Sequence, residues 1–374
     1  GLAAGVVVVA SSTAAPTVLS SSSSSRVVGV ASAGPWLVVA FATKEVKCFE
    51  ESGGGAVCGE RLAPRRPSAL AIHDGCALVA CGGELYASPL PSLDREAWLL
   101  GHTSSVITAV AAAGGLVATA DRNEKIRLSR WPQTAIIDAY CLGHRSFVSR
   151  VRFVHDDDAR LVSAGGDGAL ILWTRGEETR KVDHDEPLTC LAVARDGRVA
   201  VASQKDVFLY EDFCGGGDDA HAADDLLSSK PPTPPTRFAT ESAVVDLCFD
   251  DKDDALIALV ADAKVVLRRL GADGTQSSAL PPRLRGAVDA ATREGLAPPT
   301  TALHALDTID PQKDDAEENV PPIILRKHTI DLRVDVSVLG NKKKAKTATA
   351  ASSSDKCRET DQSELHPATS RGSG

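Results

Sequence analysis

A block of about forty residues recurs three times in this chain, and this repeat restricts the possible folds more than any other feature. The copies begin at Gly101-His102, Gly143-His144 and Asp183-His184, so their histidines lie 42 and 40 residues apart. An apolar residue follows each histidine at the fourth, seventh and ninth positions. The last two positions differ by two, which is the alternation of a β-strand. The chain is therefore predicted to be an array of short β-sheet units.

The middle copy of the repeat is the most complete. It runs from LGH through VRF to LVSAGGDGALILW, which ends at Trp173. Gly165, Gly166 and Gly168 surround Asp167, and we expect a tight hairpin there, where positive φ angles favour glycine. A period of about 40–45 residues with Gly-His near one end and Trp near the other is typical of the WD repeat. The sequence thus predicts an all-β fold, a WD-repeat β-propeller whose blades have four strands each.

Three weaker segments bring the number of readable blades to six. Each carries at least two short apolar runs around a turn, within residues 36–49, 68–87 and 243–270. A ring of seven blades is expected. The seventh blade would combine the apolar run at residues 6–9 with a late segment at residues 323–338, so that both ends of the chain close the ring.

Between and after the blades, the composition changes to residues that do not support a ladder of hydrogen bonds. The propeller is predicted to span residues 1–338, with a disordered insertion at about 215–236 and an irregular segment at about 271–322. Residues 339–374 are expected to be a disordered tail. The tail opens with Lys342, Lys343, Lys344 and Lys346, a cluster typical of a nuclear localisation signal, a phosphate-binding patch or a plain solvated tail.

Composition and motifs exclude several classes of function. A formal net charge of -9 argues against binding nucleic acid over the whole surface. The nine cysteines contain no C-x-x-C pair, which predicts buried reduced thiols rather than a zinc site. No P-loop and no glycine loop between a strand and a helix is present, so no cofactor site is predicted. The acidic run 155–158 falls between two strands of one blade, where such loops are usual, and no metal site is predicted.

Four residues of the middle repeat fit the hydrogen-bonded tetrad of a WD blade: His144, Ser163, Asp167 and Trp173. The first three resemble a catalytic triad in composition. In a WD blade, however, these groups satisfy one another and tie the strands together. No G-x-S-x-G elbow supports a hydrolase. We interpret the tetrad as structural and predict no catalytic residues.

Two stretches at the boundary between the first two copies carry a family resemblance. They read TADRNEKIRLS over Thr119–Ser129 and CLGHRSFVSRVRF over Cys141–Phe153. Together they resemble the non-catalytic WD-repeat subunit of the eukaryotic tRNA (guanine-N7) methyltransferase, with its TADRDEKIRVS-like hairpin and FCLGH-x-x-FVS segment. The resemblance implies a nuclear scaffold subunit that is not itself an enzyme. It would form a heterodimer with a catalytic subunit that binds S-adenosylmethionine, contacts most of the tRNA and methylates N7 of a guanine in its variable loop.

The same resemblance implies where the partner binds. Arg150 ends the FVS segment and is expected to pair with an acidic residue of the partner, for which a planar guanidinium is well suited. The other expected partner-binding residues are Phe147, Asp121, Arg122, Lys125 and Arg127. From the residues alone, the charged hairpin is equally a solvated loop or a recognition surface. Asn123 stands where the family has aspartate, and Ser129 stands at the tryptophan position of the tetrad.

Two other hypotheses stay open on the sequence alone. A generic WD-repeat adaptor of another protein complex would need only the propeller. An enzyme that uses the histidine, serine and aspartate of the middle repeat would need an accessible Ser163.

Overall fold

The structure, a computed structural model, describes ten ranges of the chain: residues 6–9, 17–20, 27–50, 56–154, 157–215, 233–240, 243–250, 255–261, 265–270 and 276–277. All regular elements in these ranges are β-strands, in agreement with the predicted fold class. No helix that could span a membrane is found in these ranges.

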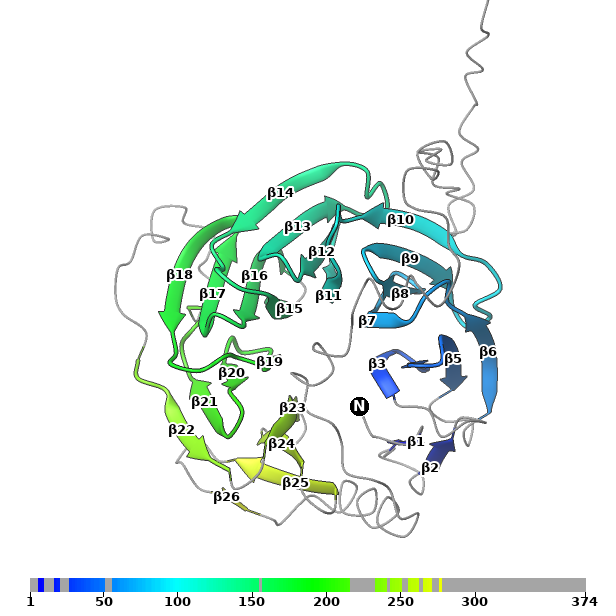
Figure 1. Cartoon of the computed structure of the whole chain (residues 1–374). Helices are drawn as coiled ribbons and strands as arrows, with labels where there is room; N and C mark the ends of the chain where they lie inside the picture. Colours follow the sequence, from blue (N-terminus) through cyan, green and yellow to red (C-terminus); the bar gives the residue numbers. More distant parts are fainter. Residues whose placement is uncertain are drawn as a thin grey trace, which may run out of the picture.

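Six four-stranded antiparallel sheets are arranged around a centre as blades (Figure 1). In each blade the strands follow chain order from the innermost to the outermost. Blade 1 holds β3 (Val27–Ala33), β4 (Trp36–Phe41), β5 (Glu45–Glu50) and β6 (Val57–Leu62). Blade 2 holds β7 (Pro67–His73), β8 (Cys76–Cys81), β9 (Glu84–Pro89) and β10 (Ala97–Gly101). Blade 3 holds β11 (Ile107–Ala113), β12 (Leu116–Asp121), β13 (Lys125–Arg130) and β14 (Ile137–Leu142).

The remaining blades follow the same order. Blade 4 holds β15 (Val148–Val154), β16 (Asp157–Gly165), β17 (Ala169–Thr174) and β18 (Glu177–Asp183). Blade 5 holds β19 (Cys190–Val193), β20 (Val199–Ala202), β21 (Asp206–Tyr210) and β22 (Thr236–Ala239). Blade 6 holds β23 (Val244–Asp250), β24 (Ala255–Ala261), β25 (Val265–Leu270) and β26 (Gln276–Ser277). The three repeats found in the sequence correspond to blades 3, 4 and 5.

A seventh, two-stranded sheet lies between blades 1 and 6 (Figure 1). It pairs β1 (Val6–Val9), the expected apolar strand, with β2 (Thr17–Ser20), a partner that the sequence did not suggest. The late segment expected there, residues 323–338, lies outside the described residues, as do 216–232 of the predicted insertion and the predicted tail. β26 falls inside residues 271–322 and pairs with β25, so the interpretation of that whole segment as irregular was wrong at this point.

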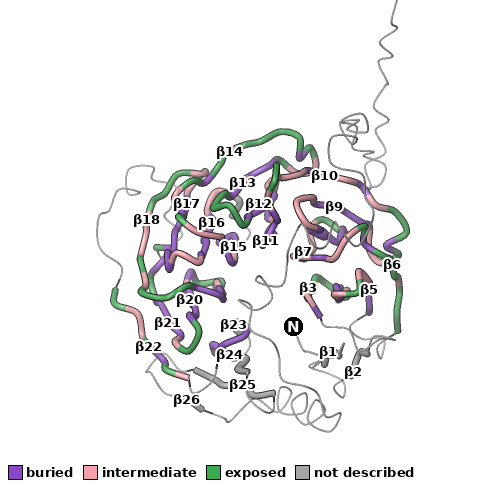
Figure 2. The backbone as a smooth tube through the Cα atoms, in the orientation of Figure 1, coloured by how far each residue is buried: buried purple, intermediate pink, exposed green. Residues whose placement is uncertain are grey.

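The core consists of apolar side chains packed between neighbouring blades. The second strands β4 and β8 are more buried than the innermost strands β3 and β7, and the outer strands β6, β14 and β18 are largely exposed (Figure 2). The position of β17 between two neighbouring blades explains why its side chains are apolar on both faces. Ile171 and Trp173 belong to a cluster shared with blade 3, and Leu170 and Leu172 to a cluster shared with blade 5. Burying each such side chain stabilises the fold by about 1.5–3 kcal/mol. Blade 4 is therefore held by both of its neighbours.

A β-bulge recurs near the start of the innermost strand in five blades, on β3, β7, β11, β15 and β23. On β15 the extra residue is Ser149. Its Oγ lies 2.9 Å from the carbonyl oxygen of Ala164 in the same blade and 2.7 Å from that of Leu188, just before blade 5 begins. On β11 the hydroxyl of Thr108 similarly donates to Ala120 and Val148 carbonyls. These buried hydroxyls link successive blades at one end of the ring.

Six of the eight described cysteines are buried free thiols, as the sequence predicted. Cys58 and Cys248 are exposed, which differs from that prediction. Burial raises the pKa of Cys81, Cys141 and Cys214 to about 12, so these thiols stay protonated and unreactive near neutral pH.

Candidate partner-binding surface

The structure brings the four tetrad residues of blade 4 into one hydrogen-bonded chain. Nδ1 of His144 donates to Oδ1 of Asp167 over 3.0 Å, because a carboxylate can only accept. The hydroxyl of Ser163 then donates to Nε2 of His144 over 2.7 Å and accepts from Nε1 of Trp173 over 2.8 Å. The chain ties the segment before β15 to β16, to β17 and to the hairpin between them.

The charge of Asp167 is stabilised within this tetrad. Burial on its own would raise the pKa of Asp167. Hydrogen bonds from His144 and from the backbone N–H groups of Arg145 and Ala169 outweigh burial and lower the pKa to about 2. The carboxylate is therefore ionised at neutral pH and acts as a fixed acceptor.

This set resembles a catalytic triad in composition, but its serine is not accessible to a substrate. Ser163 has a relative exposure of 0%, and its oxygen already accepts the indole N–H. A nucleophile must reach a substrate carbonyl. The buried geometry fits a framework role, and it weakens the hypothesis of an enzyme built on this set.

Glycine stands at three positions of the β16–β17 hairpin for different physical reasons. Only Gly168 has a positive φ, +77°, which corrects the expectation that the hairpin conformation explains all three. A Cβ at Gly165 would lie 2.6 Å from Nδ1 of His144, and a Cβ at Gly166 would lie 2.3 Å from the ring of Phe147. These two glycines leave space for the tetrad and for Phe147.

In blade 3 three hydrogen-bonded residues, His102, Thr119 and Asp121, reproduce part of this network, with the carboxylate at another position than in blade 4. His102 contacts Oδ2 of Asp121 over 2.9 Å through Nδ1, and Oγ1 of Thr119 over 2.8 Å through Nε2. Asp121 pairs with Ile107 as Gly165 pairs with Val148, so Asp121 occupies the register position of Gly165. A side chain at that position points at the histidine, which explains how Asp121 replaces the aspartate missing at Asn123.

The environment of Asp121 limits its expected role in partner binding. It is 2% exposed, and Oδ1 accepts from the N–H groups of Asn123 and Lys125 over 2.8 and 3.0 Å. Burial would raise its pKa, but these bonds and His102 lower it. Asp121 therefore shapes the hairpin from within and presents no accessible carboxylate in this structure.

Arg127 is also bound within its own blade. Its Nε donates to Oγ of Ser129 over 2.9 Å, and Nη2 donates to the carbonyl of Thr134 over 2.8 Å. Ser129 stands where blade 4 has Trp173, and the half-buried guanidinium of Arg127 is held by groups of its own blade. Arg122 and Lys125 are the exposed cations of the hairpin, and partner binding by any of these residues stays a prediction.

Phe147 and Arg150 flank the start of β15. The carbonyl of Phe147 accepts from the N–H of Gly166 over 2.7 Å, and the ring lies against that glycine. Arg150 is half-buried on the innermost strand, opposite Ala164, and its Nη1 donates to the carbonyl of Ser149 over 2.8 Å. Arg152 follows two residues further along the same strand and is exposed.

The charged hairpin and Arg150 lie at the same end of the ring. The N–H of Arg122 donates to the carbonyl of Val106, just before β11 begins. The start of β11 is joined to the start of β15 by the bond from Thr108 to Val148. We call this end, which carries the β12–β13 and β16–β17 hairpins, the hairpin face. Arg122, Lys125, Phe147 and Arg150 all belong to it.

Comparison with known proteins links this part of the chain to one family. Residues 91–207, which run from the end of blade 2 into blade 5, match the family model described as the WD40 domain of the tRNA methyltransferase TRM82. The matched part includes both hairpins and the segment from Cys141 to Phe153.

Curated relatives of the TRM82 type are found in insects and fungi. The chain is 36% identical over 164 residues to the tRNA (guanine-N(7)-)-methyltransferase non-catalytic subunit wuho of Aedes aegypti, covering 40% of this chain and 39% of that protein. It is 31% identical over 230 residues to the non-catalytic subunit trm82 of Aspergillus fumigatus, covering 42% and 45%. The chain thus spans less than half the length of these relatives.

A solved structure supports the fold independently. The WD40 β-propeller domain of Doa1 superimposes with a TM-score of 0.53 at 14% identity, covering 68% of this chain and 81% of that domain. At this identity the likeness shows the propeller fold alone.

Proposed function

We propose that this chain is the non-catalytic scaffold subunit of a tRNA (guanine-N7) methyltransferase. It would bind and stabilise a catalytic subunit that holds S-adenosylmethionine and methylates N7 of a guanine in the tRNA variable loop. The observation that carries the proposal is the TRM82 match over residues 91–207, with relatives named as non-catalytic subunits of that enzyme. The generic adaptor has no comparable support.

The proposed heterodimer contact is on the hairpin face. Arg150 is half-buried beside its own backbone, so a carboxylate from the partner would meet a guanidinium with limited freedom and limited solvation. Lys125 and Arg122 would surround this contact with positive charge. Such charges guide association and orientation of a partner with an acidic surface.

In this proposal the tRNA is bound mainly by the catalytic subunit. A net charge of -9 makes the whole chain a poor ligand for a phosphate backbone. The three cations of the hairpin face, Arg122, Lys125 and Arg150, would then serve the protein partner first.

The test is co-expression with a catalytic tRNA (guanine-N7) methyltransferase subunit, followed by pull-down and by a tRNA methylation assay. We expect a stable complex and activity that depends on this chain. Arg150→Leu should weaken the complex at least tenfold, because losing one member of a desolvated charge pair costs about 2–5 kcal/mol. Arg152→Leu is the matched control, since it removes the same charge from the same strand and should leave assembly intact. Full activity without this chain would refute the proposal.

We also propose that the protein acts in the nucleus, on the basis of the lysine cluster at residues 342–346. A fluorescent fusion of the full chain should accumulate in nuclei. Replacing Lys342, Lys343, Lys344 and Lys346 by glutamine should reduce that accumulation, and an unchanged distribution would contradict this role.

A further inference from the structure

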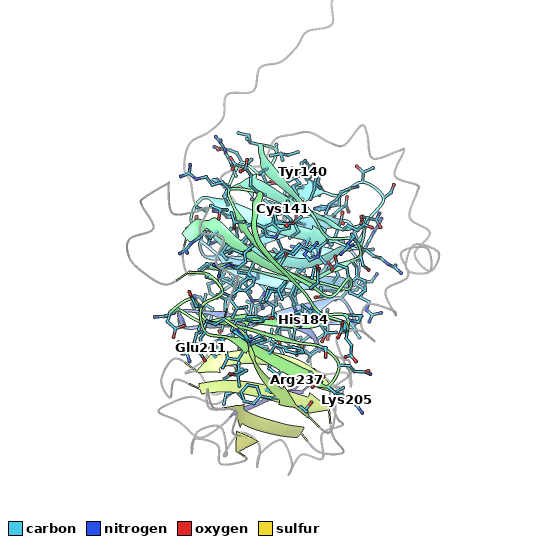
Figure 3. The ribbon with its side chains drawn as sticks, turned by 90° about the vertical axis from the view of Figure 1, so that its left-hand side faces the viewer. Tyr140, Cys141, His184, Lys205, Glu211 and Arg237 are labelled. Atoms are coloured by element: carbon cyan, nitrogen blue, oxygen red, sulfur yellow. The ribbon has the colours of Figure 1, made fainter. Side chains whose placement is uncertain are left out.

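The outer strand of blade 3 exposes an unusual amount of apolar surface. Ile137 is 42% exposed, Tyr140 45% and Leu142 65%, all on β14, and the preceding Ile136 is 47% exposed. Tyr140 lies on this outer strand in the edge-on view of Figure 3. A contiguous exposed apolar patch on a folded domain marks an interaction surface.

Two other outer strands, β6 and β18, do not show such a patch. β18 occupies the same place in blade 4 and carries charged residues at Glu177, Glu178, Arg180 and Lys181. β6 of blade 1 exposes Val57 and Leu62, but at its two ends, with Glu60 and Arg61 between them. Side chains on an outer strand are exposed because of its position. β14 differs from β6 and β18 in that most of its exposed side chains are apolar.

The patch is continuous with the hairpin face. Leu142 pairs with Lys125 across the β13–β14 ladder, so the most exposed apolar side chain adjoins the charged hairpin. The chain then runs from Leu142 through the Gly143-His144 turn to Phe147 and the start of β15. The apolar rim thus adjoins the charged hairpin at Leu142 and Lys125 and leads along the chain to the start of β15.

A stable interface needs more area than the charged hairpin and Arg150 provide, so we expect the apolar rim of β14 to take part in it. A specific heterodimer buries roughly 800 Å² on each partner, or about 20–30 residues, with an apolar centre and a polar border. A few cations on the hairpin face do not provide an apolar centre. Ile137, Tyr140 and Leu142 do, and tyrosine is among the residues that most often anchor interfaces.

We propose that Ile137, Tyr140 and Leu142 of β14 are the apolar part of the surface that binds the catalytic subunit. This inference rests on the proposed function and adds the orientation of the partner to it. The catalytic subunit presents an apolar patch to β14 and carboxylates to Lys125 and Arg150. Its footprint covers the outer rim of blade 3 and the hairpin face at the boundary with blade 4.

Leu142→Glu and Leu62→Glu provide a matched test in the full chain. Both residues are leucines on outer strands, 65% and 69% exposed, so neither change should unfold the protein. Affinity for the purified catalytic subunit is measured by biolayer interferometry, and the thermal midpoint checks the fold. Leu142→Glu should weaken binding at least tenfold, and Leu62→Glu should leave it within twofold of the parent.

The outcomes separate this inference from the proposed function. If Leu142→Glu binds like the parent while Arg150→Leu does not, the apolar rim is outside the interface and this inference is wrong. If the parent chain itself does not bind the catalytic subunit, the proposed function fails. If the parent self-associates in solution and Leu142→Glu only abolishes that association, the patch joins two copies of this chain, which also overturns the inference.

Discussion

At the scale of single residues, the histidine networks of blades 3 and 4 show that the aspartate can be supplied from different positions of the repeat. Blade 4 uses Asp167 after a glycine pair, and blade 3 uses Asp121 at the position of Gly165. Both carboxylates reach Nδ1 of a histidine at the start of their blade. The same chemical link is therefore built from two different local sequences.

The pKa of Asp167 gives this link a pH dependence. The folded-state pKa of about 2 lies below the ordinary value of 3.8, so the carboxylate stabilises the fold fully above about pH 4. That stability is lost as the pH falls through about 2. Asp167→Asn should lower the thermal midpoint at pH 7, and the difference from the parent should shrink between pH 4 and pH 2. A difference that stays constant over this range would contradict the assignment.

Gly165 is a second residue with a specific role, because the tetrad leaves no room for a Cβ atom at this position. A Cβ there would lie 2.6 Å from both Nδ1 of His144 and Oδ1 of Asp167. Gly165→Ala should lower the free energy of unfolding by about 1–3 kcal/mol, as expected for overpacking a filled site. Gly101→Ala is the control, because its nearest neighbours lie 3.7 Å away at ordinary contact distance. Equal effects of the two substitutions in urea unfolding would show that the tetrad is not crowded.

At the scale of the strand, the bulges near the start of β11 and β15 contribute to the contact between blades. Each turns a small hydroxyl, that of Thr108 or Ser149, toward the next blade. Neighbouring blades share no ladder of strand pairing. Apolar packing and these hydroxyl bonds therefore fix one blade against the next.

Ser149→Ala tests this link. The substitution removes a buried donor and leaves the carbonyls of Ala164 and Leu188 with one partner fewer, which should cost about 1–3 kcal/mol of stability. Ser32→Ala on β3, at an exposed serine, should change stability by less than about 0.5 kcal/mol. Chemical denaturation of both variants measures the effect, and a neutral Ser149→Ala would assign the link between blades to packing alone.

At the scale of the whole molecule, the two-stranded sheet of β1 and β2 fills the place between blades 1 and 6 (Figure 1). A propeller is stabilised by closing its ring, because each blade then has two neighbours. We expect this sheet to contribute to ring closure at the facing sides of blades 1 and 6.

Deleting residues 1–20 should therefore lower the thermal midpoint and increase the sensitivity of blades 1 and 6 to proteolysis. Hydrogen exchange should rise first in β3–β6 and β23–β25, and much less in blade 4. Unchanged exchange in the two flanking blades would show that β1 and β2 do not contribute to ring closure.

The sequence by itself determined the class of fold, six of the blades and the tetrad of blade 4. These depend on periodicity and on side chains a fixed distance apart in one repeat, which local sequence records directly. Only the tertiary structure decided which charged residues are accessible. Asp121 and Arg127 read as surface charges in a hairpin, but His102, Ser129 and Thr134 bind them from within the blade. The reason is physical: burial and hydrogen bonding depend on cross-strand register and on neighbouring loops. The same holds for the apolar rim of β14, whose exposure follows from its outermost place in the blade.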